Sequence, residues 1–150
     1  VSFEEGRGAP AQATFNSLTD LKDHADKGIK YFSGKATYTK TIELTKKDLS
    51  NAGNLTLDLG KVAVMAEVIV NGENLGVVWK SPFKLDVTSA LKPGKNELKI
   101  IVTNLWVNRL IGDQQPDVEN KISYTTMPFY SANSQLQPSG LLGPVRIMQK

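Results

Sequence analysis

The chain has 150 residues, of which 40% are hydrophobic and 22% are charged, and its formal net charge is +3. These proportions are typical of one globular domain that folds in water, and they argue against disorder. The 18 basic residues are interleaved with 15 acidic ones and form no basic stripe, so we expect no nucleic-acid partner. No apolar run reaches the roughly 20 residues of a membrane span, so we expect no membrane partner.

Residues 1–28 show no regular alternation, and we expect them to form an N-terminal arm or an edge strand around residues 13–15. Residues 29–150 are expected to form one β-sandwich, so that the chain is a single domain overall. The sequence begins at Val1 without an initiator methionine or a signal sequence, and we therefore expect an excised or processed part of a longer protein.

From Lys35 onward, short runs of alternating apolar and polar residues are closed by turn residues. This pattern is typical of an all-β sandwich, because alternation buries one face of each strand and leaves the other in water. The expected inward positions are Ala36, Tyr38, Ile42, Leu44, Leu55, Leu57, Leu59, Val64, Ala66, Val68, Val70, Phe83, Leu85, Val87, Leu98, Ile100 and Val102.

The pair Asn71-Gly72 gives the clearest local prediction. Both residue types tolerate positive φ, so we expect a β-hairpin that joins residues 64–70 to residues 74–79. Pro93-Gly94 predicts the next reversal of the chain. From Leu105 to Gly143 the alternation fades, and we expect a long loop, which in a compact domain is usually functional.

Aromatic and planar polar side chains are frequent in this expected loop. Sugars stack their apolar C–H faces on aromatic rings, and their hydroxyls bond to planar polar groups. The candidate carbohydrate-binding residues are Trp106, Asn108, Arg109, Asp113, Tyr130, Asn133 and Gln137.

A purely structural interpretation of the same residues stays open. In it, Trp106 closes the end of the sandwich, while Arg109 and Asp113 form an ion pair that pins a helical turn. Trp79, at the end of the predicted hairpin, faces the same choice between packing and ligand contact, and we favour packing.

The sequence offers no self-sufficient catalytic centre. It has no cysteine and a single histidine, His24, which excludes thiolate and multi-histidine metal sites. Asp113, Asp117 and Glu119 lack a diagnostic spacing, so a structural calcium ion stays open as the one cofactor considered. Asp113 with Glu119 is also the one acid pair considered for glycoside hydrolysis, and nothing in the sequence shows that the two converge. We assign no catalytic residue.

Three segments carry a family resemblance, namely IKYFSGKATYTKTIEL (29–44), LDLGKVAVMAEVIVNGENLGVVWKSPFKLDVTSALKPGKNELKIIVTNLWVNRLIGD (57–113) and PSGLLGPVRI (138–147). Through them the chain resembles the galactose-binding-like sugar-binding domains attached to glycoside hydrolases of family 2 and of the α-L-rhamnosidase type. The likeness spans residues 29–147, and it is close to the rhamnosidase-like type.

The resemblance implies a jelly-roll β-sandwich that packs beside the catalytic barrel of a larger bacterial, polysaccharide-degrading enzyme. A barrel of about 250 residues is longer than this whole chain. The resemblance also implies that Asn108, Arg109 and Asp113 reach a shared pocket, and that the enzyme is periplasmic or extracellular.

Two functions therefore compete. In the first, the domain recognises carbohydrate or contributes polar loop residues to the pocket of the barrel. In the second, it braces the catalytic domain without touching sugar, and an apolar patch including Leu110, Ile111, Met127 and Phe129 is expected on its surface. A small independent enzyme using Asp113 and Glu119 is the third and weakest hypothesis.

Overall fold

A computed structural model describes residues 1–50 and 53–149 of the chain. The strands are β1 (Ser2–Phe3), β2 (Lys35–Leu44), β3 (Leu55–Asp58), β4 (Lys61–Ala63), β5 (Met65–Val70), β6 (Glu73–Val78), β7 (Lys84–Asp86), β8 (Gly94–Thr103), β9 (Gly140–Gly143) and β10 (Arg146–Gln149). The helices are the 3-10 turn η1 (Leu21–Asp23), α1 (Lys27–Lys30), α2 (Lys46–Ser50) and α3 (Val107–Gly112).

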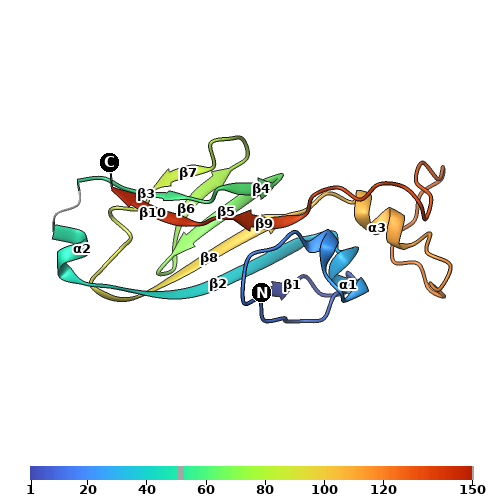
Figure 1. The fold of residues 1–150 in the computed structure, drawn as a ribbon, viewed down its shortest axis with the longest axis horizontal. Helices are drawn as coiled ribbons and strands as arrows, with labels where there is room; N and C mark the ends of the chain where they lie inside the picture. Colours follow the sequence, from blue (N-terminus) through green and yellow to red (C-terminus); the bar gives the residue numbers. More distant parts are fainter. Residues whose placement is uncertain (51–52, 150) are drawn as a thin grey trace.

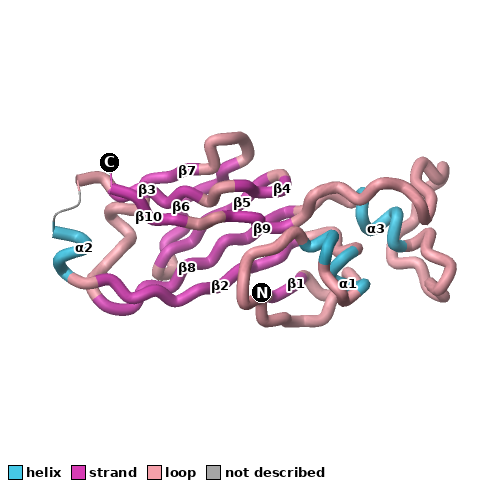
Figure 2. The backbone as a smooth tube through the Cα atoms, in the orientation of Figure 1, coloured by secondary structure: helices cyan, strands magenta, loops and turns pink. Residues whose placement is uncertain are grey.

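These strands form a β-sandwich, which confirms the predicted fold class (Figures 1 and 2). One sheet has five strands in the order β1-β2-β8-β5-β6, the other has the order β10-β3-β7, and β4 pairs with β9. The long strands β2 and β8 pair antiparallel along their whole length, from Lys35 opposite Thr103 to Leu44 opposite Gly94. No helix in the described part of the chain is long and apolar enough to cross a membrane.

The hydrophobic core lies between the two larger sheets. It is built from the alternate positions that the sequence pattern predicted, including Ala36, Leu57, Val68 and Val102, all fully buried. The predicted hairpin is also confirmed, because β5 turns into β6 through Asn71 and Gly72, which have φ values of 52° and 86°. Val64 is an exception: its φ is 96°, its side chain is exposed, and β5 begins one residue later.

The N-terminal arm differs from the prediction in detail. The edge strand is β1, which pairs with β2 at Ala36 and Thr37, and not residues 13–15. The arm returns along β1, where the Ala13 N–H donates to the Val1 carbonyl at 2.9 Å. Further along the arm, Leu21 and Ile29 are buried in the same core as the strands. The arm therefore contributes to the core as well as to the sheet edge.

The region from Leu105 to Gly143 is not loop throughout, so that prediction was wrong at both ends. It opens with α3, whose buried apolar residues Val107 and Ile111 are one helical turn apart. It closes with β9, four residues long and paired with β4 across a register shift. Both elements are too short for their periodicity to stand out in a single sequence.

Candidate functional site

Residues 105–139, here called the α3 extension, continue directly from the end of β8 and lie beyond one end of the sandwich (Figure 1). The extension consists of α3 followed by a long segment without strands that returns to β9. All seven candidate carbohydrate-binding residues lie in it.

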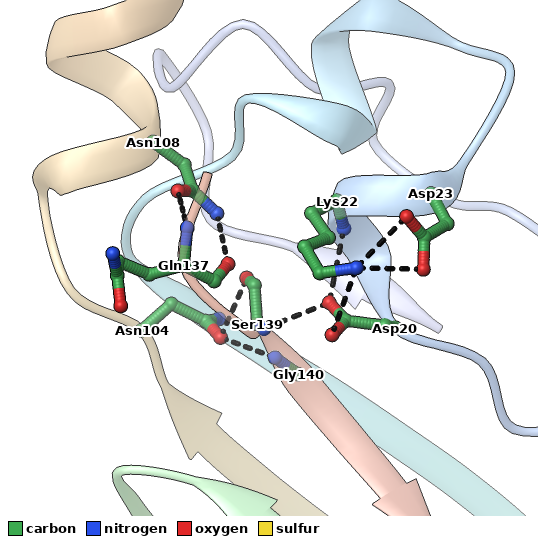
Figure 3. Close-up of polar contacts among 8 residues, drawn as sticks. All are labelled: Asp20, Lys22, Asp23, Asn104, Asn108, Gln137, Ser139 and Gly140. Atoms are coloured by element: carbon green, nitrogen blue, oxygen red, sulfur yellow. Dashed lines mark hydrogen bonds and ion pairs between the residues drawn. The ribbon is translucent and has the colours of Figure 1, made fainter. Parts of the chain in front are cut away.

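Asparagine side chains anchor the base of the extension (Figure 3). The buried Asn104 Oδ1 accepts hydrogen bonds from the Ser139 hydroxyl at 3.1 Å and from the Gly140 N–H at 2.6 Å. One turn further on, Asn108 forms a pair of bonds with the backbone of Gln137, donating to its carbonyl and accepting from its N–H, both at 2.8 Å. The outgoing and returning segments at the base of the extension are thus joined by side-chain amides.

The N-terminal arm is bonded to the same place. The Ser139 N–H donates to Asp20 Oδ1 at 2.9 Å (Figure 3). The Leu21 N–H donates to the Ser139 carbonyl at 3.0 Å. Lys22 forms ion pairs with Asp20 and with Asp23. Three distant parts of the sequence therefore meet where the extension leaves the sandwich.

A buried ion pair holds the C-terminal end of α3. Arg109 and Asp113 lie one helical turn apart, 3.0 Å between guanidinium and carboxylate, and Asp113 is only 2% exposed. The carboxylate of Asp113 also accepts from the Ile122 and Ser123 N–H groups, at 3.2 and 2.8 Å, and from the Ser123 hydroxyl. Burial alone raises the pKa of Asp113, but the hydrogen bonds from Ser123 and Ile122 and the charge of Arg109 outweigh it, so the pKa is lowered.

Close packing against α1 fixes the position of α3. A Cβ added to Gly112 would lie 2.6 Å from the Cβ of Tyr31, so the helix can approach this closely only with glycine there. The Arg109 guanidinium lies 6.0 Å from the centre of the Tyr31 ring. Farther out, an exposed ion pair joins Lys27 to Asp117, and Gln115 donates to the Ala132 carbonyl at 3.0 Å.

The structure separates the seven candidates into two groups. Asn108 is joined to Gln137, and Arg109 is joined to Asp113; the side chains of Asn108, Arg109 and Asp113 are buried. Trp106, Asn133 and the side chain of Gln137 are exposed, and Tyr130 is half-buried. The ion pair across a helical turn, which the structural interpretation predicted, is confirmed. Direct contact of these residues with sugar stays a prediction.

Both tryptophan side chains are more exposed than the structural interpretation predicted. Trp106 is 65% exposed, so it does not close the end of the sandwich. Trp79 is 66% exposed, so the expectation that it packs was wrong. It follows β6, which is the edge strand of its sheet, and its ring faces the Lys80 ammonium at 5.4 Å instead of a second layer of side chains.

Apart from Trp106, the large exposed apolar side chains of the extension were not among the candidate carbohydrate-binding residues. The large exposed ones in this region are Leu105, Trp106, Ile122, Tyr124, Met127 and Phe129. Tyr124 is 88% exposed and Phe129 is 78% exposed. Of the apolar patch predicted from sequence, Met127 and Phe129 are exposed, Leu110 is half-buried and Ile111 is buried. The segment shows no alternation, so the sequence gives the apolar type of these residues but no pattern that reveals which of them are exposed.

The loop acids do not form a calcium site. Asp113 already accepts hydrogen bonds on both carboxylate oxygens, and Asp117 is paired with Lys27. Within residues 1–50 and 53–149, no group of three or more histidine, cysteine or acidic residues is placed to hold a metal ion. The same bonds leave Asp113 unsuited to act with Glu119 as a hydrolytic pair, because Arg109 and Ser123 hold it as a buried anion.

Comparison with known proteins agrees with this architecture. The family model described as glycosyl hydrolase 2 galactose-binding domain-like matches residues 18–135. The chain belongs to this family. The matched range includes α3 and most of the α3 extension, and the family assignment confirms the resemblance seen in the sequence.

Individual relatives are much longer than this domain. A rhamnosidase structure from Novosphingobium sp. PP1Y superposes with a TM-score of 0.91 at 48% identity, covering 97% of this chain and 14% of that one. A Formosa agariphila protein named as a beta-glucuronidase is 44% identical over 89% of this chain and 13% of its own length. A Bifidobacterium dentium beta-glucuronidase structure, with a TM-score of 0.53 and 23% identity over 66% of the chain, shares the fold. The chain thus spans about one-seventh of the length of the rhamnosidase and of the Formosa agariphila protein.

Proposed function

We propose that this chain is a non-catalytic accessory domain of a larger, rhamnosidase-like bacterial glycoside hydrolase, and that its α3 extension packs against the catalytic domain of that enzyme. The observation that carries the proposal is the set of large exposed apolar side chains on a rigidly anchored extension. The family assignment and the rhamnosidase similarity support the enzyme class.

The chemistry of the extension favours a protein surface as its partner. Beside the apolar Val107 and Ile111, it buries polar and charged side chains that are hydrogen-bonded or ion-paired, whereas several large apolar ones, among them Tyr124 and Phe129, face outward. An isolated domain gains no stability from large apolar side chains on its surface, because apolar area contributes stability only when another surface covers it. Asn104, Asn108 and the Arg109–Asp113 pair then act as positioning residues that hold the apolar side chains in one orientation.

Trans-complementation tests this packing. The parent enzyme lacking this domain is mixed with the isolated chain, and association is measured by calorimetry. Phe129→Ser and Trp106→Ala are expected to weaken association by about tenfold or more each, since both would lose buried aromatic area.

Trp79→Ala is the matched control, because Trp79 is as exposed as Trp106 but lies outside the extension. Equal weakening by Trp79→Ala and Trp106→Ala would contradict a contact specific to the extension. Unchanged association in both extension variants would contradict it as well.

Carbohydrate recognition is the second candidate function, and the exposed ring of Trp106 favours it. Titration of the isolated chain with L-rhamnose, galactose and glucuronic acid, followed by tryptophan fluorescence, tests it. A saturable change that survives in Trp79→Ala and is lost in Trp106→Ala supports sugar contact. An affinity that is the same in wild type and Trp106→Ala contradicts it.

We further propose that residues 1–28 and 29–150 fold as one unit, since Leu21 and Ile29 are buried in the same core as the strands.

We also propose that the parent enzyme is periplasmic or extracellular, as expected for an enzyme that acts on polysaccharide. Cell fractionation with an antibody to this domain tests the location. Recovery of the enzyme from the cytoplasmic fraction alone would overturn it.

A further inference from the structure

One side of the sandwich is open between the edges of its two larger sheets. β2 has β8 on one side, but on the other side β1 covers it only at Ala36 and Thr37. Across the opening, β10 is the edge strand of its sheet. Among the described residues, no strand pairs with the outer edge of β2 from Thr39 to Leu44.

An apolar groove of about 1120 Å³ runs along this opening. Its floor includes Leu57 and Leu98, which belong to the core of the two sheets. Its walls include Ile42 and Ile147, which are only half-buried. A second hollow, lined by Leu44, Leu49 and Ile147 among others, continues it toward α2. The start of β1 and residues 12–18 of the N-terminal arm line the groove as well.

The backbone of β2 is oriented to accept a strand here. The Glu4 N–H donates to the Lys35 carbonyl at 3.0 Å, whereas the Phe3 N–H points away from β2 and donates to Ala11. Because antiparallel bonding alternates along a strand, the odd-numbered residues of β2 direct their backbone groups to this edge. The N–H and C=O groups of Thr39, Thr41 and Glu43 therefore face the opening.

We propose that this groove binds one extended strand of the longer polypeptide to which the domain belongs, antiparallel to β2 and in line with β1. The relatives are about seven times longer than this chain, so ample polypeptide is available. β1 already pairs with β2 at one end of the groove, and a strand in line with it continues the same ladder. The proposal rests on membership in a longer enzyme, not on the role of the α3 extension.

The register determines the side chains of the incoming strand. Residues directly opposite in an antiparallel pair share a face, so the positions opposite Ile42 and Leu44 enter the groove and are apolar. The position opposite Lys40 is acidic, because Lys40 also lines the groove. A charge directed inward on an edge strand discourages unrelated strands, so Lys40 makes the site selective.

A designed extension of the 150-residue chain tests the site. The six residues Val-Lys-Val-Thr-Glu-Thr are placed directly before Val1, so that the valines face Leu44 and Ile42 and the glutamate faces Lys40. We expect hydrogen exchange of the Thr39, Thr41 and Glu43 amides to slow by at least about tenfold, and Tm to rise by at least about 3 °C.

The control extension Lys-Val-Thr-Val-Thr-Glu has the same composition with the two residues of each successive pair exchanged, which turns its valines to solvent. A second control is Thr41→Pro in the in-register chain, which removes an N–H on the open edge and leaves the β2–β8 bonds intact. Both controls are expected to lose the protection. Equal protection by the two extensions, or none by either, would overturn the proposal.

The parent enzyme gives the decisive measurement. There, the same three amides are expected to exchange at least about tenfold more slowly than in the isolated chain. Exchange at the isolated-chain rate would show that no native strand binds to β2. Protection of β10 (Arg146–Gln149) without protection of β2 would assign the strand to the opposite edge and overturn the register.

Discussion

The sandwich and the α3 extension are stabilised in opposite ways. The sandwich buries apolar side chains, and Asn96 is its one buried polar residue among those described. The other buried polar or charged residues are Asn104, Asn108, Arg109, Asp113 and Ser139, all within or directly beside the extension. Val107 and Ile111 of α3 are buried too, but they lie outside the main core cluster.

Because of this difference, the stability of the domain and the orientation of the extension depend on different residues. Apolar packing is strong but has little directionality, whereas hydrogen bonds and ion pairs between buried polar groups admit few alternative arrangements. The sandwich therefore supplies most of the free energy of folding, and the hydrogen bonds of Asn104 and Asn108 set the direction in which the extension projects. The two regions should respond differently to substitution.

The largest effect is expected from Leu57→Ala in the sandwich. Leu57 is fully buried between the sheets, so truncation leaves a cavity and should lower the free energy of unfolding by about 4 kcal/mol. Urea denaturation monitored by circular dichroism measures it. Thr56→Ala, on the neighbouring outward position of β3, is the control and should cost less than about 1 kcal/mol. A similar loss in both variants would contradict the assignment of the core face.

Asp113→Ala should loosen the extension and spare the sandwich. It leaves Arg109 buried without its partner and removes the acceptor of three hydrogen bonds, a local cost of about 3 kcal/mol. Hydrogen exchange should quicken in residues 114–136 and stay unchanged in β5 and β8. Asp117→Ala, which breaks only an exposed ion pair, is the control. Global destabilisation equal to that of Leu57→Ala would show that the two regions are one cooperative unit.

Acid should reproduce the effect of Asp113→Ala reversibly. The pKa of Asp113 is lowered in the folded chain from its usual 3.8. Its stabilisation is therefore complete above the unfolded pKa, near pH 4, and is lost as the pH falls below that value through the folded pKa. Proteolysis of residues 114–136 by pepsin, compared between pH 4.5 and pH 2.5, should accelerate in wild type. Asp113→Asn should show less of this pH dependence, and an unchanged dependence would assign it to other groups.

The smallest expected effect is at the hairpin turn of the sandwich. Gly72 has a φ of 86°, and an added Cβ would meet no atom within 4 Å, so Gly72→Ala introduces backbone strain without a clash. We expect a loss of about 1 kcal/mol in urea denaturation. Gly60→Ala is the comparison, because its Cβ would lie 2.4 Å from the Gly143 backbone and should cost more. The reverse order would contradict the turn geometry.

The strands of the sandwich were predictable because each has several alternating positions. β2, β3, β5 and β8 follow the apolar pattern closely, and the Asn71-Gly72 hairpin depends on residue chemistry alone. Short elements were not predictable. β1 has two residues, and α3 has six, so neither contains two full periods of its pattern.

The candidate site was predictable in place but not in detail. Residue types pointed to the region after Leu105, and the spacing of Arg109 and Asp113 pointed to their ion pair. The burial of Asn108 depends on the Gln137 backbone, 29 residues away, and no local pattern reveals that contact. The exposure of Trp79 follows from the position of β6 at a sheet edge, which is a property of topology.

The anchor at Ser139 has a consequence for how the protein is made. Its partners, Asp20 and Leu21, are synthesised about 120 residues earlier, and the Tyr38 hydroxyl accepts from the Leu141 N–H across 103 residues. The nascent chain must therefore expose much of its apolar interior until the ribosome has released β9 and β10. We expect such late closure to slow folding and to leave the early strands exposed for longer during translation.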